Sequence, residues 1–419
     1  MSDTYLKFRN EVMAGGASDQ PGQESTAGGP MAWLALAVIV GLLVLLGWWN
    51  IWALVFVVGL LVCIFLHELG HFMTARATGM KVTQFFLFMG PKLFSFRRGE
   101  TEYGLRAFPI GAFVRIVGMN NLDPVDPEDE PRAYRSKSYP QRMLVITAGS
   151  VMHMIIAVVL LFAVYAINGQ RVSTDRVGVV AVSNGFPAAQ AGIEPGDILV
   201  SIDGQTPTSA KEMTELVRAH QPGDQVTVVV LRDGQELSKQ VTLGTNPDVQ
   251  GQAVAFLGVS SGSEVVWNQG SVSSAATHSI TDLGTTMWDS VGGVLKVLNP
   301  VNIYNHLSGA NTDPSSQPTT VVGITRVSAD IGNESGLGGI LLILAGVNVF
   351  IGLLNMFPLL PFDGGHAAIA TYERLRSRKG QPPYRADVGK MIPVTMAVMT
   401  LLAFLLVAGF YLDQVKPIK

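Results

Sequence analysis

The sequence predicts a polytopic α-helical membrane protein that carries a soluble α+β insert. Three observations lead to this fold class. Mean hydropathy is +0.33, and only 15% of the 419 residues are charged, against about 25% in ordinary globular domains. Several apolar runs reach the length of about 20 residues that a helix needs to cross a bilayer. Between two of these runs, the chain changes to short β-branched segments separated by turn residues.

Four apolar runs are predicted as core transmembrane helices, at about 51–75, 143–167, 337–360 and 391–412. A further run at 31–49 precedes them. Trp48, Trp49 and Trp52 lie where these first two runs meet, and tryptophan prefers the membrane interface. We therefore predict an extra N-terminal span joined to the first core span by a tight helical hairpin. One long tilted or interfacial helix is the alternative interpretation.

Basic residues predict the orientation of these spans. Lys and Arg are concentrated in the segment 76–142 and in the short segment 374–390, whereas 168–336 has few for its length. The positive-inside rule therefore predicts that the two basic segments are cytoplasmic and that 168–336 lies outside. With the extra span, the N-terminus is cytoplasmic and the C-terminus is outside. Residues 1–30 are rich in Gly, Ser and Gln and are predicted to form a disordered tail, and 413–419 form a short tail.

Charge and cysteine content exclude two classes of function. The formal net charge of −3 gives no basic surface for a nucleic-acid partner. The lipid bilayer is the expected environment. The single cysteine, Cys63, lies in an apolar run, so an intramolecular disulfide is impossible and no redox motif is present.

Residues 172–245 are predicted to form a small strand-rich domain. Its β-branched runs are separated by turn signals such as Asp203-Gly204 and Asp233-Gly234, and 209–220 has the pattern of a helix. The string from Gly185 to Leu199, followed by Ile202-Asp203-Gly204, resembles the bacterial PDZ signature. Residues 246–336 are predicted to be an extracytoplasmic connector that contains an amphipathic helix at about 275–298. His306 in this connector has no neighbour at metal-ligand spacing and is expected on the surface.

The strongest chemical signal is His67-Glu68-Leu69-Gly70-His71 within the first core span. Residues i and i+4 share one face of a helix, so two imidazoles can hold one zinc ion, and the intervening glutamate can act as a general base. Polar side chains are costly at bilayer depth. Their presence in an apolar span therefore predicts an intramembrane metal site.

Catalytic zinc usually has three protein ligands, and Asp363 is the candidate for the third. It ends an otherwise uncharged run, after Pro358 and Pro361, which are expected to break the helix. Gly364-Gly365 is expected to permit a tight turn there. A turn residue at the cytoplasmic interface is the competing interpretation of Asp363, and His366 is a weaker candidate for the same ligand position.

Together these motifs resemble the site-2 protease family, whose members are intramembrane zinc metalloproteases. H-E-L-G-H, a PDZ insert after the second core span and N-x-x-P-x-x-P-x-D-G-G ending the third support this resemblance over about 51–412, and the single-PDZ actinobacterial form is the most similar. The resemblance implies Zn²⁺ bound by His67, His71 and Asp363. It implies Glu68 as the general base and Asn355 as a residue that positions substrate or stabilises the transition state.

The resemblance also implies a membrane-associated β-hairpin at about 81–117, between the first two core spans of 51–167. In the family this hairpin presents the substrate as an extended strand. Gly111-Ala112 and Met89 depart from the glycines that are usual there. The last two core spans, within 337–412, carry the Asn355–Asp363 motif.

The implied function is regulated intramembrane proteolysis in a bacterial plasma membrane. The expected substrates are single-span proteins such as an anti-sigma factor, another membrane regulator or a remnant signal peptide. The PDZ domain, which is extracytoplasmic, binds a peptide or C-terminus or excludes uncut ectodomains. A membrane zinc transporter or sensor and a catalytically silent PDZ scaffold are the alternative functions.

Overall fold

The computed structural model describes residues 30–119, 123–183, 185–246, 254–308, 316–378 and 380–418. The chain divides into two compact units. One comprises Asn168–Ala275 and is called the insert below. The other comprises the sequence on both sides of it and is called the membrane unit. Apart from Pro30, the predicted tail at 1–30 lies outside the described residues.

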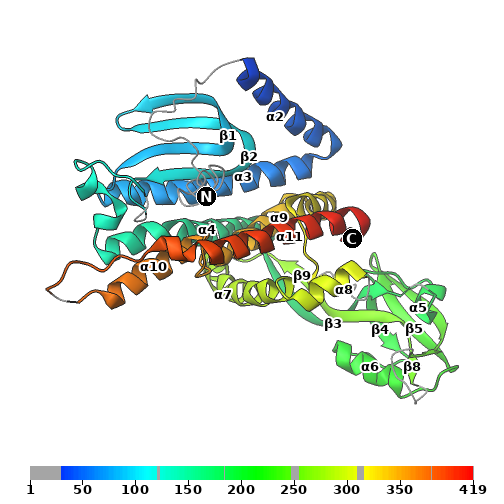
Figure 1. Cartoon of the computed structure of the whole chain (residues 1–419). Helices are drawn as coiled ribbons and strands as arrows, with labels where there is room; N and C mark the ends of the chain where they lie inside the picture. The colour runs from blue at the N-terminus through cyan, green and yellow to red at the C-terminus, as the bar shows by residue number, and fades with distance from the viewer. Residues whose placement is uncertain are drawn as a thin grey trace. The chain divides into compact units, whose positions relative to one another are not determined.

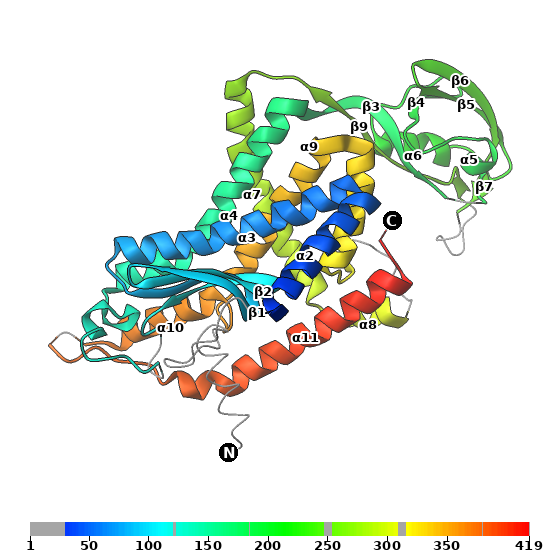
Figure 2. The same cartoon turned by 90° about the horizontal axis from the view of Figure 1, so that it is seen from above.

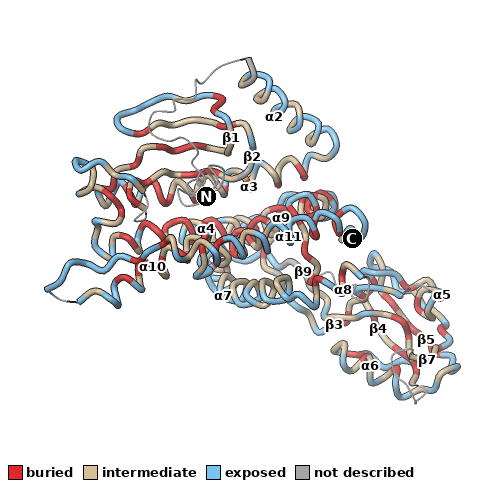
Figure 3. Tube along the Cα trace, viewed as in Figure 1, coloured by how far each residue is buried: buried red, intermediate tan, exposed pale blue. Residues whose placement is uncertain are grey.

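Within the described residues, five helices are long and apolar enough to cross a membrane, namely α2 (Pro30–Trp49), α3 (Ile51–Ala77), α4 (Tyr139–Asn168), α9 (Val321–Asn355) and α11 (Ile392–Val415). Helices α3, α4 and α9 pack together in both views of the molecule (Figures 1 and 2). Phe56 and Leu60 of α3 form a buried cluster with Ile340 and Leu344 of α9. By contrast, α2 is largely exposed (Figure 3).

The first two helices are separate rather than continuous. Asn50 between them has an extended backbone, and its side chain accepts hydrogen bonds from the amides of Trp52 and Ala53, which caps α3. Helix α2 then folds back to contact the strands that follow α3 (Figure 1). The alternative of one long helix is therefore wrong.

Helix α9 begins earlier than the predicted third span and contains a kink. Gly336 has φ 62° and ψ −150°, which interrupts the helical geometry sixteen residues after Thr320 caps the start of α9. The helix ends at Asn355, before Pro358, and a short irregular segment leads to α10 (Asp363–Arg376). Asp413, in the predicted tail, is part of α11. Its buried carboxylate accepts a hydrogen bond from the Thr320 amide.

The expected β-hairpin is present as two long antiparallel strands, β1 (Val82–Arg98) and β2 (Thr101–Ile116). Each strand bends, and Phe88 and Gly111 have positive φ near the two bends. As a result Phe86 pairs with Gly104 on one side and with Phe113 on the other. The hairpin therefore has four strand segments, and the last one, 111–116, pairs along one edge only within the described residues.

The insert is built on a five-stranded antiparallel sheet with strand order β6-β5-β4-β3-β9. Its elements are β3 (Gln170–Val182), α5 (Pro187–Gln190), β4 (Ile198–Ile202), α6 (Ala210–Arg218), β5 (Gln225–Arg232), β6 (Gln235–Thr242) and β9 (Val259–Asn268), with a two-stranded ribbon of β7 (Gly244–Thr245) and β8 (Ala255–Phe256). Alternate apolar residues of the strands and Met213 and Val217 of α6 form one buried core (Figure 3). The unit extends beyond the predicted range 172–245 because β9 pairs with β3.

The remaining elements lie in the sequence of the membrane unit, and one of them, α7, begins in the last residues of the insert. They are η1 (Glu130–Arg132), η2 (Tyr134–Ser136), α7 (Val272–Val297), α8 (Pro300–Ser308) and η4 (Val388–Met391). His306 of α8 is buried, and its Nε2 lies 2.9 Å from the Ser316 hydroxyl. The expectation of a surface histidine was wrong, because this contact provides a partner that sequence spacing did not reveal. The protein is a polytopic α-helical membrane protein with an α+β insert, as predicted.

Candidate metal centre

Helix α3 carries the two histidines of the predicted motif on one face. His67 and His71 are both buried, at 7% and 8% exposure. Their Nε2 atoms lie 3.2 Å apart. This proximity follows from helix geometry, since residues four apart stack one turn above the other.

Asp363 brings a carboxylate to the same point from a segment almost 300 residues later. Its Oδ2 lies 3.2 Å from Nε2 of His71 and 3.6 Å from Nε2 of His67. Asp363 is the first residue of α10, so it begins a helix and does not terminate one. The interpretation of Asp363 as a turn residue at the interface is therefore wrong.

The two glycines after Asp363 act differently from the prediction. Gly364 and Gly365 are buried in the first turn of α10 and do not have positive φ. A Cβ atom on Gly364 would lie within 3.0 Å of the Met356 backbone, and one on Gly365 would lie equally close to the Leu360 backbone. These glycines are therefore required because α10 packs closely on the preceding segment. They are not required by a tight turn.

The three side chains fit a tetrahedral metal ion. Ligands about 2.0–2.1 Å from zinc, at tetrahedral angles, lie about 3.3 Å from one another, and the three separations in the structure are 3.2, 3.2 and 3.6 Å. Oδ2 of Asp363 is buried without a hydrogen-bond partner. Among the described residues, these three form the one group of His, Cys, Asp or Glu side chains with metal-binding proximity.

Neighbouring groups on α4 orient the histidine rings. Nδ1 of His71 lies 2.8 Å from the carbonyl oxygen of Val145. A carbonyl only accepts, so Nδ1 carries the proton and the Nε2 lone pair is available to a metal. The ring of His67 lies beside Gly149, and its centroid is 4.8 Å from that of His153.

Sequence reasoning missed a buried polar chain behind the histidines. Nδ1 of His153 lies 2.7 Å from Oδ1 of Asn348 on α9. The Asn348 amide donates to the Leu344 carbonyl at 2.7 Å and lies 3.2 Å from the sulfur of Cys63. The signal that identified His67 could also have identified His153 and Asn348, because both are polar residues inside predicted spans.

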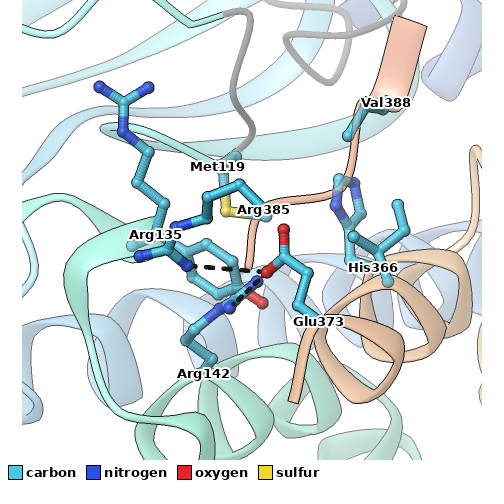
Figure 4. A pocket seen from close by; sticks show the side chains of 9 residues that line it. Met119, Arg135, Arg142, His366, Glu373, Arg385 and Val388 are labelled. Atoms are coloured by element: carbon cyan, nitrogen blue, oxygen red, sulfur yellow. Dashed lines mark hydrogen bonds and ion pairs between the residues drawn. The ribbon is translucent and has the colours of Figure 1, made fainter. Parts of the chain in front are cut away.

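Three other predicted residues lie around this centre. Glu68 is half-buried, and the backbone of Val114 on β2 lies beside its carboxyl group. Asn355 is the last residue of α9 and is half-buried. His366 is absent from the metal-binding group and lines a separate pocket with Arg142 and Glu373 (Figure 4).

Two buried histidines on the membrane-length helix α3 and an aspartate at the start of α10, with a glutamate beside the first histidine, are the residues of a membrane-embedded metallohydrolase site. The sequence profile of Peptidase family M50 matches residues 55–402. The chain belongs to this family, which confirms the predicted membership of the site-2 proteases.

The relatives agree with this assignment. The chain is similar to zinc metalloprotease Rip1 of Mycobacterium tuberculosis, at 33% identity over 87% of this chain and 97% of the relative. It is also similar to zinc metalloprotease Rip1 of Mycolicibacterium smegmatis, at 29% identity over 88% of this chain and 98% of the relative. The protein is therefore a zinc metalloprotease with Zn²⁺ as its cofactor.

Two solved structures are similar to part of this chain. The PDZ domain of an SdrC-like protein from Listeria monocytogenes matches 22% of this chain and 92% of its own length, at 22% identity and a TM-score of 0.19. The PDZ domain of an SdrC-like protein from Listeria innocua matches 20% of this chain at 24% identity, also with a TM-score of 0.19.

Proposed function

We propose that this protein cleaves the transmembrane segments of single-span membrane proteins in regulated intramembrane proteolysis. The observation that carries the proposal is the His67–His71–Asp363 group, which is held by membrane helix α3 and by α10 directly after α9. A hydrolytic centre at that depth has access to peptide bonds that are otherwise protected by lipid.

In this proposal His67, His71 and Asp363 hold the zinc ion. Zinc, when bound, supplies a Lewis acid that polarises the scissile carbonyl and makes water a stronger acid. Glu68 accepts the proton of the attacking water and delivers it to the leaving amine, as a general base and then a general acid. The side-chain amide of Asn355 orients the substrate or donates a hydrogen bond to the developing oxyanion.

The substrate is expected to bind as an extended strand along segment 111–116 of β2. A transmembrane helix hides its carbonyls in internal hydrogen bonds, so it must unwind before cleavage. The open edge of this segment offers replacement hydrogen bonds, which matter most where lipid excludes water. The position of Val114 beside Glu68 supports this site, because a strand paired there lies next to the proposed base.

The expected substrates are an anti-sigma factor, another single-span regulator or a remnant signal peptide. In this proposal the protein lies in a bacterial plasma membrane with the insert on the outer side, as the distribution of basic residues predicts. The insert binds a peptide or C-terminus at a sheet edge, or it excludes substrates whose ectodomains have not been trimmed.

The experiment that tests this function uses Glu68→Gln in the full-length protein. The variant should retain zinc and an unchanged melting temperature, because glutamine keeps the size of the side chain and the three ligands are intact. It should cleave a purified single-span substrate at least about 10²-fold more slowly, the typical contribution of general acid–base catalysis. Cleavage at the wild-type rate would refute the role of Glu68.

Identification of substrates follows from the same variant. Single-span proteins that accumulate in cells carrying Glu68→Gln, measured by mass spectrometry of membranes, are the candidates. The proposal expects cleavage within their transmembrane segments by the wild-type protein. Cleavage sites confined to soluble domains would contradict it.

A further inference from the structure

We propose that one face of α4, a helix that supplies no ligand, sets the positions of all three ligands of the metal centre. This inference rests on the proposed role of His67, His71 and Asp363. The face consists of Arg142, Val145 and Gly149, at positions i, i+3 and i+7, which lie on one side of a helix. Val145 and Gly149 lie against the histidine ligands, and Arg142 pairs with Glu373 of the helix that carries Asp363.

Val145 fixes His71. Its carbonyl oxygen lies 2.8 Å from Nδ1 of that histidine. The bond selects the tautomer whose Nε2 is unprotonated, and it fixes the rotation of the ring about its bond to the helix. Because the group is a backbone carbonyl, the position of α4 along α3 determines where His71 points.

Gly149 limits the space available to the imidazole rings of His67 and His71. A Cβ atom at this position would lie less than 3.0 Å from atoms of His67 and of His71. The backbone of α4 therefore lies directly against the two imidazoles. Alanine is the better helix former, so the expected penalty at 149 comes from the clash of its Cβ with the two rings, whose atoms are the nearest to it.

Arg142 fixes Asp363 through α10. Helix α10 carries Asp363 at its first position and Glu373 ten residues later. Glu373 accepts a hydrogen bond from Nη1 of Arg142 at 2.7 Å, and both side chains are only 8% exposed (Figure 4). A second link joins the two helices between the hydroxyls of Tyr139 and Thr371, at 3.2 Å.

The same carboxylate is held from another direction as well. The amide of Ala386 donates to Oε1 of Glu373 at 2.8 Å, and Nη1 of Arg385 lies 3.6 Å from Oε2 (Figure 4). These groups fix both the rotation of α10 and its position along its own axis. An Arg–Glu pair out of water is weakly screened and strict in its geometry.

Apolar packing by itself does not determine the rotation of α10 or its position along its axis, which together are called its register below. Ala367 and Ala370 of α10 pack in a cluster with Phe72 of α3 and with Val145 and Ile146 of α4. Such contacts are non-directional, and alanine side chains allow α10 to slide or rotate with little loss. The hydrogen-bonded groups are directional, and they select one register, in which Asp363 meets the histidines.

The first test compares Gly149→Ala with Gly346→Ala. A Cβ at Gly346, on α9, would have no neighbour within 4 Å, so it is a matched control for the same change in a membrane helix. Zinc affinity of the detergent-solubilised full-length protein is measured by competition with a chromogenic chelator. Gly149→Ala should bind zinc about 10- to 100-fold more weakly, as is typical for residues that support ligands. The control should match wild type.

The second test remains informative if Gly149→Ala fails to fold. The double variant Arg142→Met/Glu373→Gln removes the buried ion pair, and the glutamine keeps a side-chain oxygen that accepts from the Ala386 amide, so the fold should tolerate the change. It should keep the melting temperature of the apoprotein, bind zinc about 10- to 100-fold more weakly, and change the visible absorption spectrum of the Co²⁺-substituted protein. Lys92→Met/Glu102→Met is the control, because it removes a buried ion pair within the hairpin.

The outcomes separate this inference from the proposed function. If His67→Ala and His71→Ala retain full zinc, the proposed ligand set is wrong. If these variants lose zinc while Gly149→Ala and the α4–α10 double variant match their controls in zinc affinity and Co²⁺ spectrum, only the role of α4 is wrong. Weaker zinc binding and an altered spectrum in the α4 variants, with unchanged controls, would support the inference.

Discussion

At the scale of single residues, the metal centre depends on which lone pairs are available. Nε2 of His71 is available because Val145 engages Nδ1, and Oδ2 of Asp363 is buried without a hydrogen-bond partner. Polar atoms without partners are costly inside a protein. Their convergence with the Nε2 of His67 is therefore the strongest physical indication of a bound cation at this point.

Asp363→Ala should remove one ligand and lower zinc binding by more than the roughly 10- to 100-fold typical of a supporting residue. His366→Ala should leave the metal content unchanged, since His366 lies in the pocket with Glu373. Zinc stoichiometry of the purified protein, measured by mass spectrometry of the metal, checks both. Full zinc in Asp363→Ala together with loss in His366→Ala would assign the third ligand to His366.

The sequence predicted the two histidines and the aspartate, but it misjudged how the aspartate is held. His67 and His71 were predictable because helix geometry alone brings positions i and i+4 together. Gly364 was expected in a turn, yet it packs α10 against backbone. Contacts between residues far apart in the sequence, such as His153 and Asn348, depend on how the helices pack. No local sequence pattern predicts that packing.

At the scale of elements, the hairpin differs from a simple pair of strands. Phe88 and Gly111 have positive φ, so both strands bend and the sheet has four segments. The resemblance to the site-2 protease family implied the hairpin, but it did not indicate the bends, which lie where Phe88, Gly90 and Gly111 have positive φ. Their effect is that, in the described part of the chain, segment 111–116 pairs along one edge only, and Val114 on this segment lies beside Glu68.

Val114→Pro tests the open edge. Proline removes the amide hydrogen of Val114, and it is tolerated where that hydrogen does not belong to the internal ladder. We expect kcat/KM for a single-span substrate to fall about 10-fold, which corresponds to the roughly 1.4 kcal/mol of one lost hydrogen bond. Zinc content should stay at the wild-type value. An unchanged kcat/KM would exclude a catalytic contribution of the Val114 amide, whether by pairing with substrate or by holding the Glu68 carboxyl group.

The insert contains an ion pair that should make its stability depend on pH. Arg232 donates to Asp197 through Nε at 2.6 Å and Nη2 at 2.8 Å, and it holds the pKa of that buried carboxyl below its usual range. Because the pKa is lower in the folded state, the stabilisation is complete above the unfolded value of about 3.9. It is lost as pH falls through the lower folded pKa.

Thermal unfolding of a fragment with residues 168–275 checks this expectation by circular dichroism. The melting temperature should be constant from neutral pH to about pH 4 and should then fall with acidification. Asp197→Asn should melt several degrees lower at neutral pH and should show a weaker decline below pH 4. Identical acid profiles for the two proteins would show that Asp197 does not stabilise the insert.

At the scale of the whole molecule, the candidate metal ligands and the insert belong to different compact units of the chain. All candidate ligands lie in the membrane unit, and the insert has its own core. Gln170 pairs with Asn268 at the base of β3 and β9, so the insert leaves and rejoins the membrane unit at neighbouring points. Such a domain can be removed without stretching the chain.

Replacing residues 171–267 by a two-residue turn should therefore leave zinc binding intact. The shortened protein should cleave a substrate that lacks its ectodomain, because the ligands and the hairpin are unaffected. Cleavage of a substrate with its folded ectodomain distinguishes the two proposed roles of the insert. A gain of this activity indicates a size filter, whereas slower cleavage of trimmed substrates indicates peptide capture. Loss of zinc would contradict the separation of the two units.

The sequence by itself determined the spans, the strand-rich insert and the chemical identity of the site. These features follow from local patterns, namely apolar run length, β-branched alternation and the spacing of two histidines on one helix. The tertiary structure alone decided that Asp363 begins α10 and meets those histidines, that α4 supports the ligands without contributing one, and that Val114 on the hairpin lies beside Glu68. The physical reason is that each depends on contacts between segments far apart in the chain, which form only when the helices pack.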